Sequence, residues 1–158
     1  MDMNNSMTHY MQLLATNQPW NLIIFMAIPV ILAEFIAVTE LVILFGRDLA
    51  GKLKQANRIA SIIVGIYFLF IFIYLFTTAF VPLTVSGGWR GITDVIAVSF
   101  YLLGVVPLMG MALLELNFIA RGRNAEDRLK IHAAFVGLFL IVAHIAMIFG
   151  MLDPRILA

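Results

Sequence analysis

Residues 59–83 read IASIIVGIYFLFIFIYLFTTAFVPL and contain no charged side chain. A run of about 20 apolar residues is long enough to cross the hydrocarbon core of a bilayer as a helix. A single lipid-exposed segment can satisfy its own backbone hydrogen bonds only as a helix. This stretch therefore predicts a transmembrane helix, and it decides the fold class of the chain.

Three further segments have the same character, at about 20–45, 92–120 and 129–152. Pro107 is expected to interrupt the third of these spans, and Pro29 to kink the first. The short alternating runs of a membrane β-barrel do not occur. The sequence predicts an all-α integral membrane protein, a four-transmembrane-helix up-and-down bundle with short loops.

The composition points to the same class. Of the 158 residues, 63% are hydrophobic and 12% are charged, whereas an ordinary soluble domain has about 25% charged residues. A small soluble domain could not bury this much apolar surface. The net charge of +1 and the lack of a dense basic tract give no reason to expect nucleic acid as a partner. The absence of cysteine excludes disulfides, thiolate metal sites and cysteine nucleophiles.

The distribution of basic residues predicts the orientation. Two loops carry four basic residues each, namely Arg47, Lys52, Lys54 and Arg58 after the first span and Arg121, Arg123, Arg128 and Lys130 after the third. The remaining loop has only Arg90 and the C-terminus only Arg155. Cytoplasmic loops are enriched in Lys and Arg, so both termini are expected on the non-cytoplasmic side of the plasma (inner) membrane.

The first nineteen residues precede the first span and contain no Lys or Arg, so they lack the basic region of a signal peptide. Residues 8–18 are polar at both ends and apolar between, which favours a short amphipathic helix on the outer membrane surface. A loosely ordered tail is the alternative. Trp20 and Trp89 are expected to be interfacial anchors. The predicted organisation is a surface segment, 1–19, followed by a transmembrane domain, 20–158.

Five ionisable side chains within the spans are candidate functional residues: Glu34, Glu40, Glu115, His132 and His144. Counting about 1.5 Å per residue from each span's centre places Glu34 near the midplane, as a candidate proton-relay group. The same count places Glu40, Glu115 and His132 at one depth, roughly 10 to 13 Å toward the cytoplasmic side. They come from three different helices.

Helical periodicity indicates which faces turn inward. On the third span one stripe contains Tyr101, Gly104, Leu108, Met111 and Glu115. A glycine on such a stripe is typical of a surface that contacts other helices, and Ser61 with Gly65 offers a similar patch on the second span. His132 and His144 lie about 120° apart, so they cannot both face one narrow site.

Glu40, Glu115 and His132 suit two kinds of chemistry. Their oxygen and nitrogen atoms are ligands for a divalent metal such as Zn, Mn or Fe(II). Without a metal, the same groups can relay protons. The structural alternative is that the three residues only join helices, with Arg58 reaching in from the surface.

A second hypothesis is a membrane redox protein that binds b-type haem and exchanges electrons with quinol. Haem iron takes axial His or Met ligands. His144 and His9 supply one such pair, and Met11, Met147 or Met151 could replace His9. A further ligand set, suited to Cu(I), comprises Met1, Met3, Met7, His9 and Met11.

The leading hypothesis is a small membrane protein whose buried carboxylates and histidine bind protons or a divalent metal, in transport or as a subunit of a membrane complex. Four spans are few for a transporter and no internal repeat is evident, so a homo-oligomer or larger complex is expected. The haem protein is the alternative, and a structural membrane subunit is the further alternative.

Overall fold

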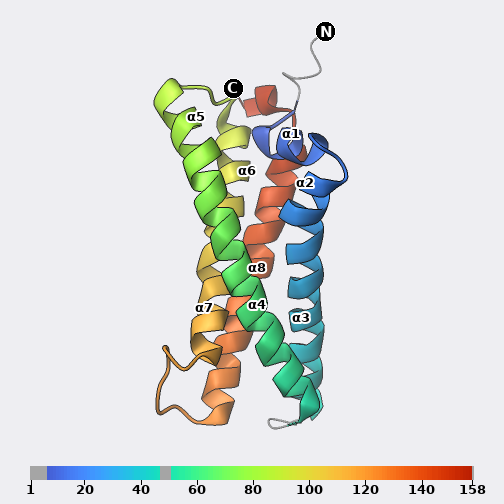
Figure 1. The fold of residues 1–158 in the computed structure, drawn as a ribbon, viewed down its shortest axis with the longest axis vertical. Helices are drawn as coiled ribbons and strands as arrows, with labels where there is room; N and C mark the ends of the chain where they lie inside the picture. The colour runs from blue at the N-terminus through green and yellow to red at the C-terminus, as the bar shows by residue number, and fades with distance from the viewer. Residues whose placement is uncertain (1–6, 47–50, 158) are drawn as a thin grey trace. The chain divides into compact units, whose positions relative to one another are not determined.

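The computed structural model of the chain describes residues 7–46 and 51–157 (Figure 1). Within these ranges every regular element is a helix, and four helical segments are long and apolar enough to cross a membrane: Trp20–Gly46, Lys52–Ser86, Ile92–Glu115 and Ala125–Met151. The predicted all-α fold with four long apolar helices is therefore confirmed, and their length and composition are consistent with a helical membrane bundle. Of the residues named above, Met1, Met3 and Arg47 lie outside the described ranges.

The helices group into two compact units. The first unit comprises residues 1–27, 70–104 and 140–158, and the second comprises residues 28–69 and 105–139. Two long helices, α4 (Lys52–Leu75) and α8 (Ala125–Met151), contribute residues to both. Each unit is described by itself.

Proline shapes the first two spans in the same way. In the first span, α2 (Trp20–Leu22) leads into a π-helix, η2 (Ile23–Ala27), and Pro29 follows in α3 (Ile28–Gly46). In the second span, α4 leads into the π-helix η3 (Phe76–Phe80), and Pro82 follows in α5 (Val81–Ser86). A proline has no N–H, and its ring clashes with the carbonyl four residues earlier. The wider π-turn relieves this clash.

The third span differs from the prediction in two respects. It is interrupted at Gly104, between α6 (Ile92–Leu103) and α7 (Val105–Glu115), so Pro107 lies in the first turn of α7, where a missing N–H is tolerated. It also ends at Glu115 and not near residue 120. Asn117 adopts a left-handed φ of 63°, and the Phe118 N–H bonds the Leu113 carbonyl at 2.9 Å. These features form a Schellman cap.

The second and fourth helices begin earlier than predicted, at Lys52 and Ala125 in place of 59 and 129. Counting apolar residues misses their polar first turns. In α8 the Asp127 N–H donates to Asn124 Oδ1 at 2.7 Å, which is an N-cap interaction.

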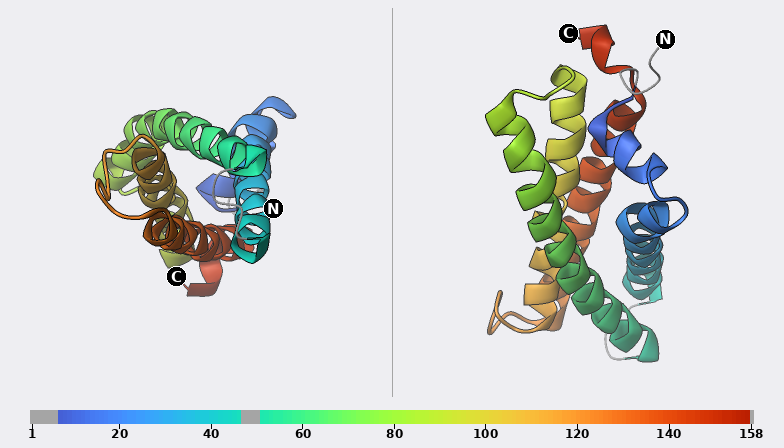
Figure 2. Two further views of the ribbon diagram at one scale, coloured as in Figure 1. Left: turned by 90° about the horizontal axis from the view of Figure 1, so that it is seen from below. Right: turned by 45° about the horizontal axis from the view of Figure 1, so that its top comes forward.

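The second unit is a ring of four helical segments, as the left view of Figure 2 shows from below. The Asn57 amide joins α4 to α3 by donating to the Ile36 carbonyl at 3.1 Å. Glycines allow close approach at two other contacts. A Cβ at Gly65 on α4 would lie 2.5 Å from Ala112 Cβ on α7, and one at Gly110 on α7 would lie 2.6 Å from the Phe135 ring on α8. The expected close contact at Gly65 is therefore present.

The first unit contains a short helix, α1 (His9–Ala15), within the segment predicted as an amphipathic helix. Its apolar residues Tyr10 and Leu14 are buried. The Thr8 hydroxyl donates to the Gly150 carbonyl of α8 at 2.6 Å. In the same unit the Tyr101 hydroxyl donates at 2.5 Å to the Phe25 carbonyl, which is the carbonyl that Pro29 cannot bond.

Candidate functional site

The structure separates the five ionisable span residues by burial. Glu40, Glu115 and His132 are 2%, 6% and 0% exposed, whereas Glu34 and His144 are exposed. His132 and His144 lie about 120° apart around the axis of α8, as the sequence indicated, and Glu34 and Glu40 are separated by the same angle on α3. The three residues predicted to share a depth are thus also the three that face the interior.

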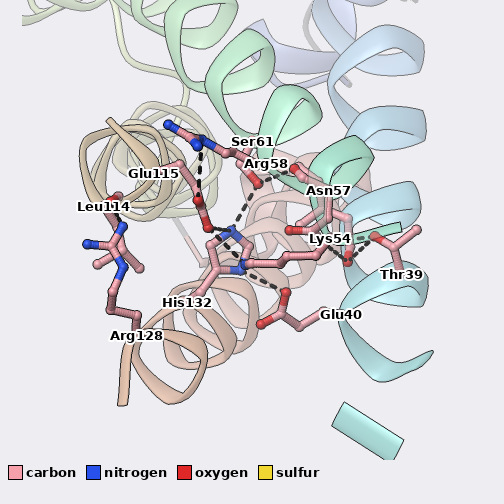
Figure 3. Close-up of polar contacts among 11 residues, drawn as sticks. Thr39, Glu40, Lys54, Asn57, Arg58, Ser61, Leu114, Glu115, Arg128 and His132 are labelled. Carbon is pink, nitrogen blue, oxygen red and sulfur yellow. Dashed lines mark hydrogen bonds and ion pairs between the residues drawn. The ribbon is translucent and has the colours of Figure 1, made fainter. Parts of the chain in front are cut away.

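His132 lies at the centre of a polar cluster in the second unit (Figure 3). On one side of the ring, Nδ1 is 2.9 Å from Glu40 Oε2 of α3. On the other side, Nε2 is 2.9 Å from Ser61 Oγ of α4 and 3.9 Å from Glu115 Oε1 of α7. We refer to Glu40, Ser61, Glu115 and His132 as the His132 cluster. One imidazole of α8 therefore reaches side chains of the three other helical segments in the unit.

Cations balance the carboxylate of Glu115. Lys54 Nζ lies 3.0 Å from Oε1, and Arg58 Nε lies 3.9 Å from Oε2. A buried carboxylate without such partners would be strongly destabilising, because its charge has lost the solvation of water. The arginine expected to reach in from the surface is present, but Lys54 makes the closer contact.

The Glu40 carboxylate has fewer charged partners than the Glu115 carboxylate. Its only ion-pair partner among the described residues is His132, at 2.9 Å, and the two atoms in contact are not aligned for a hydrogen bond. Neither Glu40 oxygen nor His132 Nδ1 makes a well-formed hydrogen bond within the described part of the chain, and the same holds for Asn57 Oδ1. Buried polar atoms normally have hydrogen-bond partners, and exceptions require a chemical explanation.

Ser61 connects α4 to the His132 ring. Its hydroxyl lies 2.8 Å from the Asn57 carbonyl and 2.9 Å from His132 Nε2. In the tautomer with a hydrogen on Nε2, the hydroxyl donates to the carbonyl and accepts from the ring. Nδ1 then presents its lone pair toward Glu40, and a hydrogen bond between these two groups requires a proton on one of them.

A basic cavity of about 430 Å³ adjoins Glu115 in the same unit. Its lining has four cationic side chains and one carboxylate; the residues are Lys54, Arg58, Glu115, Asn117, Arg123, Ala125, Arg128 and Leu129. Glu115 belongs to both the cavity and the His132 cluster. The cavity thus provides access to the more exposed end of the cluster.

Sequence reasoning placed Ser61 in a helix-contact patch but missed two polar contributors near the start of α4, Lys54 and Asn57. Lys54, Asn57 and Ser61 recur at helical spacing and precede Gly65 on the same face. That stripe was a usable signal, but the predicted span began at residue 59 and left its first half among the loop residues.

The geometry of the three candidate metal ligands differs from that of a metal centre. Glu40 and Glu115 face different nitrogens of the His132 ring, so the carboxylates do not converge on one nitrogen lone pair. Over 7–46 and 51–157, no group of three or more His, Cys, Asp or Glu side chains is arranged to hold a metal ion.

The two histidines of the haem hypothesis belong to the first unit and have separate partners. His9 Nδ1 lies 2.5 Å from Asp94 Oδ2, and the His9 backbone N–H donates to Oδ1 at 2.7 Å. His144 is exposed, and its Nδ1 bonds the Leu140 carbonyl of its own helix at 2.6 Å. The haem site remains a prediction that these contacts do not favour.

Asp94 is a third buried carboxylate, and the count of ionisable span residues overlooked it. It is fully buried near the start of α6, where it also accepts from the Arg90 N–H at 3.2 Å. The Arg90 guanidinium donates to the Met7 carbonyl and to Gln12. This network holds the start of α1, and a cavity of about 350 Å³ lies beside it, lined in part by His9 and Gln12.

Residues 3–158 match the model of a protein family described as a family of unknown function (DUF6803). Because the match covers nearly the whole chain, the protein belongs to this family. No curated protein and no solved structure matches it.

Proposed function

We propose that the His132 cluster binds protons and relays them within the membrane, in transport or as part of a larger membrane assembly. The observation that carries the proposal is the position of His132, which is fully buried with a carboxylate beside each ring nitrogen. An imidazole can accept a proton at one nitrogen and release one from the other. Buried titratable groups with charged partners are candidates for such a role.

The order of the groups suggests a path from the basic cavity to Glu115, then to His132 and Glu40. The contact between His132 and Glu40 is short, at 2.9 Å, and transfer there requires the two groups to align into a hydrogen bond. The 3.9 Å gap between His132 and Glu115 exceeds hydrogen-bond distance. Transfer there requires a bridging water or a small movement of the Glu115 side chain. Ser61 offers a shorter partner to the same nitrogen and can hold the ring in position.

Four apolar helices indicate a multi-pass protein in a lipid bilayer. The basic residues around the cavity favour a cytoplasmic position for this end of the second unit. We therefore place the cavity mouth on the cytoplasmic side of the plasma membrane and both termini on the opposite side.

Glu34 supports an assembly larger than one chain. Its side chain is exposed on α3 between the exposed apolar residues Ile31, Phe35 and Val38. An ionised carboxylate that faces acyl chains is costly. A second copy or another subunit that covers this face would remove the cost, and a protonated Glu34 could then donate a hydrogen bond across the contact.

Proton flux into reconstituted vesicles tests the proposal. Vesicles that contain a pH-sensitive dye receive a potassium diffusion potential, and the rate of internal pH change is recorded. We expect His132→Gln and Glu40→Gln to reduce the flux about tenfold or more, because each removes a proton carrier. His144→Gln is the matched control, since it changes an exposed histidine, and it should leave the flux unchanged. Full flux in His132→Gln would refute the proposal.

Two measurements on the purified protein separate the alternatives. Stoichiometric divalent metal that is lost in Glu40→Gln and Glu115→Gln would assign the same residues to a metal site. A Soret absorption band that is lost in His144→Ala would assign the protein to haem chemistry.

A further inference from the structure

The four cationic side chains that line the basic cavity outnumber its one carboxylate, that of Glu115. Lys54 is the one cation that makes a close ion pair there, with Glu115 at 3.0 Å. Arg58 lies 3.9 Å from the same carboxylate, and half of its side chain is exposed. Arg128 donates to the neutral Leu114 carbonyl and has no ion pair with any residue that the structure describes. The Arg123 side chain has no ion-pair or hydrogen-bond partner within the described ranges.

The acidic residues in the first turn of α8 lie outside the cavity lining. Glu126 pairs with Lys130 at 3.1 Å on the exposed surface of α8, and neither residue lines the cavity. Asp127 also lies outside the lining, and its backbone N–H is used in the helix cap. Ala125, the first residue of α8, also lines the cavity, and the acidic residues in the first turn of this helix offset its dipole.

Such a cavity has the chemistry of a phosphate site. Guanidinium groups match phosphate oxygens with paired N–H donors. The Asn117 side chain contributes an amide to the lining. The volume of about 430 Å³ lies within the range of about 300 to 1,000 Å³ that is usual for small-ligand sites. It can hold a phosphate together with part of an ester substituent.

We propose that the basic cavity binds a phosphate group, supplied either by the head group of an anionic lipid or by a soluble phosphate compound. The phosphate would contact Arg58, Arg123 and Arg128 and approach Lys54. These residues are expected at the cytoplasmic surface, where both sources are available, and basic pockets at this level bind anionic head groups.

The site would also be coupled to the His132 cluster, and this part rests on the proposed function. The charged groups that face Glu115 are Lys54 and Arg58 from α4 and His132 from α8, with Glu40 of α3 beyond the imidazole. A phosphate that draws Lys54 and Arg58 away favours protonation of Glu115. By linkage, protonation of Glu115 must then favour phosphate binding to the same degree.

The test measures binding at equilibrium, without a proton gradient. The protein is incorporated into nanodiscs of zwitterionic lipid and titrated with inorganic phosphate. In parallel, nanodiscs that contain phosphatidylglycerol are analysed by native mass spectrometry for lipid that stays with the protein. Phosphate binding alone would indicate a soluble ligand, and lipid retention alone would indicate a head group. Binding in both assays would leave the phosphate group itself as the recognised feature.

The variants are chosen so that loss of folding cannot explain the result. We expect Arg123→Gln to weaken binding about tenfold, as for loss of one charge-assisted contact, and its side chain has no partner whose loss could unfold the unit. The matched control is Lys130→Gln, which removes an exposed cation of α8 outside the cavity, and it should bind as the wild type does. Absence of binding in both assays, or equal losses in Arg123→Gln and Lys130→Gln, would overturn the proposal.

The coupling between phosphate binding and protonation of Glu115 is tested separately, by the pH dependence of phosphate affinity. Dimethyl phosphate keeps one negative charge between acidic and neutral pH, so its affinity reports on the protein. We expect tighter binding at acidic pH in the wild type and no such change in Glu115→Gln. Glu40→Gln should still bind phosphate, even where proton flux is lost. Phosphate binding without any pH dependence would overturn the coupling alone and leave the binding site in place.

Discussion

Removal of the Lys54 ammonium group tests how the second unit tolerates a buried carboxylate. In Lys54→Met, Glu115 keeps only Arg58 and His132, each at 3.9 Å. Breaking a fully buried ion pair costs roughly 3 to 5 kcal/mol. The Lys54 side chain is 22% exposed and Arg58 remains, so we expect a lower cost, about 2 kcal/mol at neutral pH. In Lys54→Met/Glu115→Gln the unpaired charge is gone, and most of this stability should return.

Equilibrium unfolding in mixed micelles, followed by circular dichroism, measures these free energies. The two single variants and the double variant form a cycle whose expected coupling is about 1.5 kcal/mol. Lys52→Met is the control, because Lys52 is exposed on the same helix, and it should change stability by less than about 0.5 kcal/mol. Additive effects of Lys54→Met and Glu115→Gln would refute the inference that this ion pair stabilises the unit.

Three further predictions concern packing and pH. Gly65→Ala should destabilise the protein by about 1 to 3 kcal/mol, because its Cβ would lie 2.5 Å from Ala112 Cβ and 2.7 Å from the Leu108 carbonyl oxygen. Gly137→Ala, with no neighbouring atom within 4 Å, should be neutral or stabilising in the same unfolding assay. Burial raises the pKa of Tyr10 from 10.0 to about 12, so the docking of α1 should weaken as the pH rises through this interval; an absorbance titration of tyrosinate in wild type and Tyr10→Phe checks this, and an unchanged curve would contradict it. Hydrogen bonds from Arg155 lower the pKa of Asp153 from 3.8 to about 2, so their contact should be lost only as the pH falls through this range; NMR titration should show the Asp153 pKa returning toward 3.8 in Arg155→Gln.

Hydropathy was sufficient to predict the four helices, because span length follows from bilayer thickness. It was less informative about helix ends and irregularities. The apolar run of the third span continues through Leu116, Phe118 and Ile119, but the left-handed turn at Asn117 ends the helix at Glu115. The π-turns before Pro29 and Pro82 depend on how each proline's clash is relieved, and apolar counting contains no information about that choice.

For the candidate site, the sequence predicted the level of each side chain along its helix better than the side of the helix on which it faces. Glu40, Glu115 and His132 share a depth because each position along a helix follows from residue number. Which side of each helix faces inward depends on packing among all four segments, so Glu34 and His144 were chosen as candidates although both are exposed. Lys54 and Asn57 were missed for a different reason, because the polar first turns of α4 lie before the apolar run that begins at residue 59.

Solid-state ¹⁵N NMR of the His132 ring in lipid bilayers tests the proton-sharing contact most directly. Nε2 should stay protonated throughout a pH titration, because Ser61 accepts its hydrogen, while Nδ1 gains a proton as the pH falls. In Glu40→Gln the Nδ1 response should move, since its partner is no longer a carboxylate. An Nδ1 signal that is unchanged across the pH range of the folded protein, or is identical in Glu40→Gln, would contradict a shared proton at this site.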